Sequence, residues 1–146
     1  MKPENELNAR FPSLSANEAL ARQMAAAFAA QLDPTLEELG DLKTAVSEAV
    51  TNAIVHAYPD SIGPVSLRLR RLPGNVLEIT VKDRGCGIPD VAKAREPMFT
   101  TGGAERSGMG FTSMESFMNS FSLRSAPGKG TTVRMRKKLT GRGELG

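Results

Sequence analysis

Cysteine is scarce in this chain: Cys86 is the single cysteine among 146 residues. One thiol can neither close an internal disulfide nor supply the thiolate cluster of a structural zinc site, so the composition fits a reducing compartment. Long apolar runs are also absent, and the N-terminal stretch MKPENELNARF lacks the apolar core of a signal peptide. We therefore expect a cytoplasmic protein that neither spans nor binds a membrane.

The common nucleotide-binding motifs are absent too. The chain has no G-x-x-x-x-G-K-[ST], no complete G-x-G-x-x-G, and neither an H-R-D nor a D-F-G run. Any nucleotide site must therefore be of another kind. The basic C-terminal stretch RMRKKLTGR has no interleaved aromatic residues to stack on bases, so we expect a final strand with a solvated face and no direct contact with nucleic acid.

The residues that are present have the composition of one globular domain over residues 1–146, with 40% hydrophobic and 24% charged residues. Ser15 with Glu18, and Thr35 with Glu38, have the spacing of capping boxes, which predicts a helix beginning at each point. The second helix is expected to continue to about residue 57. Apolar spacing predicts the buried positions, which are Leu20, Met24, Ala27 and Phe28 in the first helix and Leu42, Ala45, Val46, Ala49, Val50, Ala53 and Ile54 in the second.

Alternating apolar residues predict strands at 65–72 and 75–83, joined as a hairpin by the turn PGN. A long weakly structured segment follows, then a third helix at 108–119 and two closing strands at 120–126 and 131–139 joined by PGKG. Helices and mostly antiparallel strands in this order predict an α+β fold, a two-layer sandwich with the helices on one face of the sheet.

Three polar residues lie four apart along one flank of the second helix: Glu48, Asn52 and His56. On its own this spacing favours an ordinary solvated flank. The alternative is that the three residues form the edge of a site, and the remainder of the sequence must decide between the two.

Glycine-rich motifs occur at three later points. Asp83, Gly85 and Gly87 form D-x-G-x-G directly after a strand, where glycines allow a bound group close to the backbone. Gly108 and Gly110 open the third helix, whose free N–H groups favour an anion such as phosphate. G-T-T at 130–132 begins the last strand. Each motif alone is compatible with a plain turn, and Cys86 is expected to be a bystander.

Taken in order, E-x-x-x-N, D-x-G-x-G, G-x-G and G-T-T resemble the Bergerat ATP-binding fold shared by DNA gyrase, Hsp90, histidine kinases and MutL. The motifs span residues 48–132. Within that superfamily, VSEAVTNAIVHAY, EPMFTT, ERSGMGF and MESFMN resemble the sporulation anti-sigma-F factors, which are serine-protein kinases that hold a sigma factor inactive. The general-stress anti-sigma-B switch kinases are the nearest alternative.

The resemblance implies roles for individual residues. Glu48 is expected to be the catalytic base, Asn52 a ligand of Mg²⁺, and Asp83 the acceptor for the adenine amino group. Residues 96–110 are expected to form a lid over ATP or ADP. The remaining nucleotide contacts implied by the family are Gly85, Gly87, Arg106, Ser107, Gly108, Met109, Gly110 and Thr131.

The resemblance also implies partners. Glu18 and Arg22 on the first helix are expected to contact a sigma-F-type factor and an anti-anti-sigma protein, which would be the substrate of an ATP-dependent serine kinase, and a homodimer is expected. A different possibility stays open: Gly102 and Gly103 stand where relatives carry a lysine, and a weakened lid would suit a nucleotide-responsive binding module that transfers no phosphate.

Overall fold

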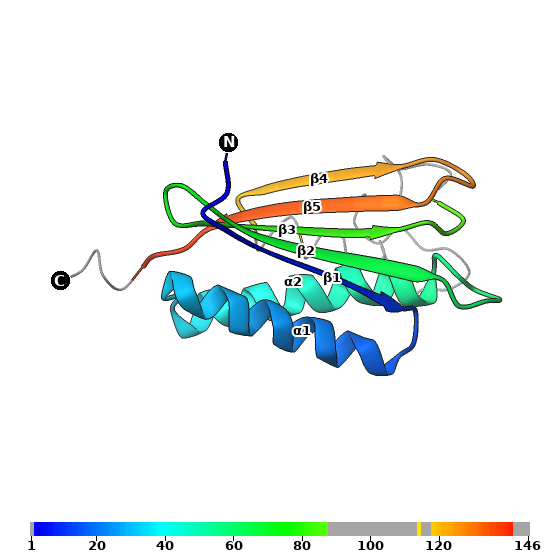
Figure 1. The fold of residues 1–146 in the computed structure, drawn as a ribbon, viewed down its shortest axis with the longest axis horizontal. Coiled ribbons are helices and arrows are strands. Elements are labelled where there is room, and N and C mark those ends of the chain that lie inside the picture. The colour runs from blue at the N-terminus through cyan, green and yellow to red at the C-terminus, as the bar shows by residue number, and fades with distance from the viewer. Residues whose placement is uncertain (1, 88–113, 115–117, 142–146) are drawn as a thin grey trace.

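The computed structural model describes residues 2–87, 114 and 118–141. One strand comes first, two long helices follow, and the remaining strands complete the described part of the chain (Figure 1). In chain order they are β1 (Asn5–Pro12), α1 (Ala16–Ala29), a 3₁₀ turn η1 (Ala30–Leu32), α2 (Leu36–Val55), β2 (Pro64–Leu72), β3 (Val76–Asp83), β4 (Ser120–Ser125) and β5 (Thr131–Lys138).

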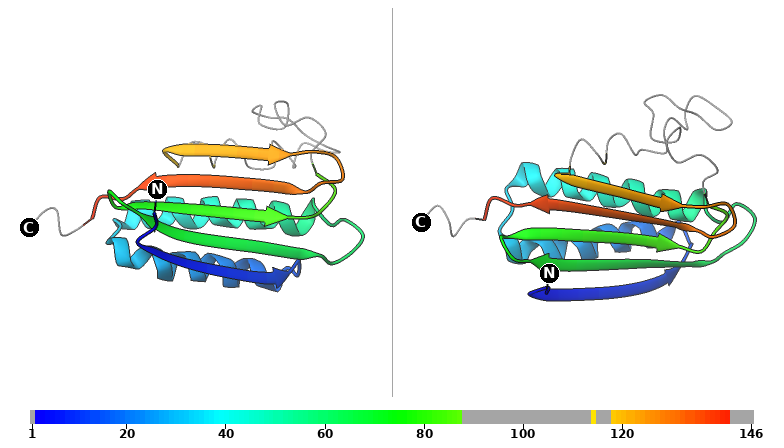
Figure 2. Two further views of the ribbon diagram at one scale, coloured as in Figure 1. Left: turned by 45° about the horizontal axis from the view of Figure 1, so that its top comes forward. Right: turned by 90° about the horizontal axis from the view of Figure 1, so that it is seen from above.

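The strands form one sheet in the order β1-β2-β3-β5-β4, and all four neighbouring pairs are antiparallel. Both helices cover the same face of this sheet, while no described helix covers the other face (Figures 1 and 2). This two-layer α+β arrangement confirms the predicted fold class. No described helix is long and apolar enough to cross a membrane.

The core lies between the helices and the sheet. The predicted stripe of α2 is buried from Leu42 to Ala53, and Ile54 packs against it. The predicted stripe of α1 was partly wrong, because Leu20 is 50% exposed and Ala27 is exposed. The buried residues of α1 are Ala21, Ala25, Phe28 and Ala29.

The excess of alanines explains this error. A helix with apolar side chains on several faces does not reveal from its sequence which face packs, and small side chains let two helices approach closely. α1 therefore buries Ala21, Ala25 and Ala29 together with Phe28 and leaves Leu20 exposed.

The two predicted capping boxes have different outcomes. The Thr35 hydroxyl accepts from the Glu38 N–H at 3.1 Å, and the Glu38 carboxylate accepts from the Thr35 N–H at 2.9 Å, which confirms the second box. The first was wrong, since Ser15 has helical backbone angles and makes no side-chain cap. The Asn17 side chain instead ties the start of α1 to the Pro12 carbonyl, at 2.9 Å.

The sequence did not predict β1, which pairs with β2 along the edge of the sheet. Leu7, Ala9 and Phe11 alternate with polar residues, which is a strand pattern, but the run is short and Phe11 is its one buried residue. Both predicted hairpin pairs, β2 with β3 and β4 with β5, are present. The predicted third helix lies almost wholly outside the described residues, although Met114 and Met118 are buried.

Candidate functional site

A narrow cavity lies between α2 and the adjoining ends of β3 and β5. Its polar lining comes from Asn52 and His56 on α2, Asp83 on β3 and Thr131 on β5. The remaining described lining residues are Ala49, Ala53, Ala57, Val81, Gly87 and Val133. The space accessible to water is about 20 Å³, about enough for one water molecule, so a nucleobase can enter only if the walls separate.

Asp83 is the buried carboxylate of this cavity, with 6% of its surface exposed. Its Oδ1 accepts from the Gly85 N–H at 2.9 Å and from the Thr131 N–H at 3.2 Å. Within the described part of the chain, no hydrogen bond reaches Oδ2. Burial raises the pKa of Asp83, and the two backbone hydrogen bonds oppose this rise without cancelling it. Asp83 therefore keeps one oxygen available to accept from an amino group.

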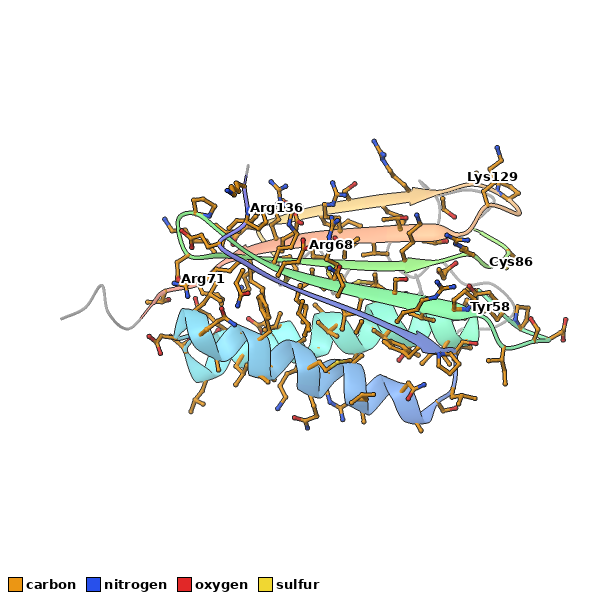
Figure 3. The ribbon with its side chains drawn as sticks, in the orientation of Figure 1. Tyr58, Arg68, Arg71, Cys86, Lys129 and Arg136 are labelled. Carbon is orange, nitrogen blue, oxygen red and sulfur yellow. The ribbon has the colours of Figure 1, made fainter. Side chains whose placement is uncertain are left out.

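The D-x-G-C-G turn is fixed against the C-terminal end of α2. Cys86 donates its N–H to the Ala57 carbonyl at 3.0 Å and its Sγ–H to the His56 carbonyl at 3.2 Å. These are carbonyls that a helix end leaves without intrahelical partners. Figure 3 shows Cys86 and Tyr58 at this end of the molecule, where the Tyr58 hydroxyl accepts from the Arg84 N–H at 2.7 Å.

This packing explains the two glycines of the motif. A β-carbon on Gly85 would clash with the Ala57 carbonyl, so a side chain there would push the turn away from α2. Gly87 has a φ of +77°, which favours glycine, and a β-carbon there would clash with the Ala126 carbonyl. Gly87 lines the cavity, whereas Gly85 is not among the lining residues and donates its N–H to the Asp83 carboxylate.

The α2 trio divides at this cavity. Asn52 and His56 line it, while Glu48, one turn earlier on the same flank, is partly buried and is not among the lining residues. His56 is the C-cap residue of α2, and its N–H donates to the Asn52 carbonyl at 2.9 Å. The sequence analysis gave His56 no role at the site. Its spacing of four residues from Asn52 places both on one flank of α2, and this spacing could have indicated that His56 lines the cavity.

The Asn52 amide oxygen is one group of this cavity that could hold a magnesium ion. No group of three His, Cys, Asp or Glu side chains that could hold a metal is found among the described residues. Asn52 offers one amide oxygen, and Mg²⁺ bound with a nucleotide commonly takes its other ligands from phosphate and water.

The structure thus brings together four predicted residues: Asn52, Asp83, Gly87 and Thr131. The predicted phosphate contacts Arg106, Ser107, Gly108, Met109 and Gly110, and the lid at 96–110, lie outside the described residues.

The predicted partner residues on α1 form an ion pair, with Arg22 Nη1 2.9 Å from Glu18 Oε1. Arg22 Nη1 also lies 3.4 Å from the Ser47 hydroxyl, so the pair is held at the junction of α1 and α2.

Comparison with known proteins agrees with the fold. Residues 11–137 match the histidine kinase-like ATPase domain family. A crystal structure of the RsbU and RsbW domains of a Mycobacterium tuberculosis protein superposes with a TM-score of 0.67 at 18% identity, covering 94% of this chain and 33% of that one. The histidine kinase domain of Erythrobacter litoralis EL346 gives 0.55 at 28% identity, covering 71% of this chain and 46% of that one. The chain thus spans less than half of either structure.

Curated relatives are similar over nearly their whole length. The anti-sigma F factor of Caldanaerobacter subterraneus is 54% identical over 140 residues, which are 95% of this chain and 97% of that protein. The anti-sigma F factor of Bacillus subtilis is 50% identical over 139 residues, 94% of each. The chain therefore belongs to the histidine kinase-like ATPase family and, within it, to the anti-sigma F factors.

Proposed function

We propose that this chain is a cytoplasmic anti-sigma factor that binds a sigma-F-type factor and phosphorylates an anti-anti-sigma protein on serine, with ATP as the donor. The observation that carries the proposal is the cavity in which Asn52, Asp83 and Thr131 meet. The names of the relatives favour the sporulation branch over the general-stress branch.

In this proposal the adenine enters between α2 and the ends of β3 and β5. Its amino group donates to Asp83 Oδ2, because Oδ1 is occupied by the N–H groups of Gly85 and Thr131. A buried acceptor that no other group satisfies discriminates strongly between bases that can and cannot donate to it. Ala53, Ala57 and Val81 supply the apolar walls.

Phosphoryl transfer needs mainly positioning and charge neutralisation. The Asn52 amide oxygen would hold Mg²⁺, which neutralises charge on the phosphate oxygens when bound. The substrate serine oxygen bonds to the γ-phosphorus, the bond from that phosphorus to ADP breaks, and the hydroxyl proton passes to Glu48. Glu48 precedes Asn52 by four residues, so both project from the same helix face.

For the partners, we propose that Glu18 and Arg22 form part of the surface bound by the sigma factor and by the antagonist. Their ion pair is partly buried beside Ser47, which immediately precedes Glu48. Such a location would let a bound partner contact α1 while its serine reaches the nucleotide. A homodimer would present two of these surfaces.

The experiment that tests the catalytic proposal is Glu48→Gln. The variant removes the proton acceptor but keeps the side-chain size, so we expect label transfer from γ-labelled ATP to the purified antagonist to fall at least about a hundredfold. ADP binding should stay within about twofold of the parent, since the change spares the cavity lining.

The matched control is Glu37→Gln, an exposed glutamate in the first turn of the same helix. It should leave transfer unchanged. Undiminished transfer by the Glu48 variant would exclude Glu48 as the base.

A second candidate is a nucleotide-responsive module that binds its partners and transfers nothing. The position of Glu48 outside the described cavity lining favours it. The same assay separates the two candidates, because the module predicts no label on the antagonist even with the parent protein.

A further inference from the structure

The face of the sheet that the helices leave open carries polar side chains in rows that cross all five strands. The strand register fixes these rows, because paired residues of neighbouring strands point to the same side. The first row is Arg10, Ser66, Lys82, Thr132 and Arg124; the second is Asn8, Arg68, Thr80, Arg134 and Ser122; the third is Glu6, Arg70, Glu78, Arg136 and Ser120. Figure 3 shows Arg68 and Arg136 on this open side.

The third row is neutralised internally. Glu78 is only 1% exposed, and its carboxylate lies 2.8 Å from Arg136 Nη2 and 3.3 Å from Arg70 Nη1. Glu6 lies 3.4 Å from Arg70 Nε. The two acids of this row therefore match its two arginines.

The first two rows contain cations and no acid. They hold Arg10, Lys82, Arg124, Arg68 and Arg134. Among the described residues, the one ion pair of this set is a long contact of 3.8 Å from Arg68 to Glu78. Strands lie about 4.8 Å apart, so five positive charges gather within a band about 19 Å long, with the distant contact to Glu78 as their one described counter-charge.

These two rows also form a hollow with a hydroxyl at its floor. Its volume is about 580 Å³, and its described lining consists of both rows with Ala9 and Leu67. Thr80 is 8% exposed, and its Oγ1 has no hydrogen-bond partner among the described residues. Arg68 Nε is likewise buried without a partner there. A buried hydroxyl and a buried N–H without protein partners are costly unless water or a ligand satisfies them.

We propose that this hollow binds a compact polyanion bearing several phosphate groups. The cations at the rim supply the attraction, and the Thr80 hydroxyl and Arg68 N–H supply directional contacts at the centre. No aromatic side chain is among the described lining, so recognition is of the phosphates rather than of a base. The hollow lies on the opposite side of the sheet from the Asp83 cavity, so the two sites are separate.

The probe is inorganic tripolyphosphate, titrated calorimetrically without magnesium into the full chain. The parent should bind it, more weakly as salt rises. Lys82→Gln with Arg134→Gln should weaken binding at least about tenfold. Thr80→Val keeps the charge and the branched shape, and should weaken it about threefold or more.

The control for charge is the double variant Lys129→Gln with Lys43→Gln. It also removes two positive charges, but at positions outside the hollow, and should change the affinity for tripolyphosphate less than about twofold. Saturation with ADP, which fills the nucleotide cavity, should leave tripolyphosphate binding intact, and this separates the two sites. Circular dichroism checks that each variant is folded.

The proposal is overturned if the parent does not bind tripolyphosphate, if the charge control weakens binding as much as the paired variant does, or if saturating ADP abolishes it. It is also overturned if Thr80→Val has no effect, since binding would then be general attraction. Preferential binding of duplex DNA, or self-association that requires Lys82 and Arg134, would assign the face to that partner instead.

Discussion

Asp83 is where stability and ligand binding oppose each other most directly. Burial raises its pKa, so the Asp83 carboxylate binds a proton more readily in the folded protein than in the unfolded chain. The ionised carboxylate therefore lowers stability at neutral pH, and this penalty shrinks as the pH falls through the raised pKa towards the ordinary value of 3.8. The site keeps a destabilising group that a nucleotide could use.

Asp83→Asn tests this balance. Asparagine can still accept the two backbone hydrogen bonds with its one carbonyl oxygen, and it carries no charge. We expect the variant to melt above the parent at pH 7, with a difference that narrows as the pH approaches about 4. Thermal denaturation of both proteins across this range measures it, and a difference that does not vary with pH would contradict the assignment.

Single residues differ in how far the sequence could place them. The roles expected of Asp83 and Asn52 follow from the resemblance to the family, which rests on the order of the motifs that contain them. The contacts of Gly85 and Cys86 do not, because they depend on the backbone of Ala57 and His56, about thirty residues earlier, reaching the same turn.

At the scale of elements, the start of α2 differs from the start of α1 although both carry a capping-box spacing. Thr35→Ala removes a hydrogen bond to the Glu38 N–H, so we expect the free energy of unfolding to fall by about 1 kcal/mol. Ser15→Ala removes no cap, and the change should stay within about 0.5 kcal/mol. Urea denaturation compares them; equal losses would mean that Ser15 caps α1 after all.

Glu38 also joins α2 to the chain beyond β5. Burial raises the pKa of this carboxyl, but hydrogen bonds from Thr35 and Thr140 outweigh that effect, and the net pKa lies below the ordinary 4.5. A carboxyl whose pKa is lowered by folding stabilises the folded protein at pH values above its pKa in the unfolded chain. This stabilisation is lost as the pH falls through the lowered pKa.

Glu38→Gln should therefore lower the melting temperature at pH 7, and the deficit should shrink as the pH falls below 4.5 and through the lowered pKa of the folded protein. The neighbouring Glu37→Gln is the control, because Glu37 is exposed. A deficit that persists unchanged in acid would show that the Glu38 charge makes no contribution.

Elements with a long run of regularly spaced apolar residues, or with a clear turn motif beside them, could be predicted from the sequence. Elements with a short or ambiguous apolar pattern were missed or placed on the wrong face. The apolar period of α2 and the turns PGN and PGKG indicated the helix and both hairpins. β1 carries only a short alternating pattern, Leu7, Ala9 and Phe11, and it pairs with β2 at the edge of the sheet. α1 was predicted as a helix but with the wrong face, since its alanines allow several.

At the scale of the whole molecule, topology assembles the candidate nucleotide site. β5 pairs with β3 although β4 intervenes in the chain, and this places Thr131 opposite Asp83. No local pattern predicts this pairing; the resemblance to the family implied only that Asp83 and Thr131 both contact the nucleotide. The same register lines up the cations of the open face, which the sequence indicated only as a solvated strand face.

The central claim is that the cavity between α2 and the ends of β3 and β5 binds the adenine nucleotide through Asp83. Calorimetric titration of ADP with magnesium into the parent and into folded Asp83→Asn tests it most directly. The parent should bind ADP, and the variant should bind at least about a hundredfold more weakly, because an amide N–H then faces the amino group of the base. Equal affinities for ADP would contradict the account.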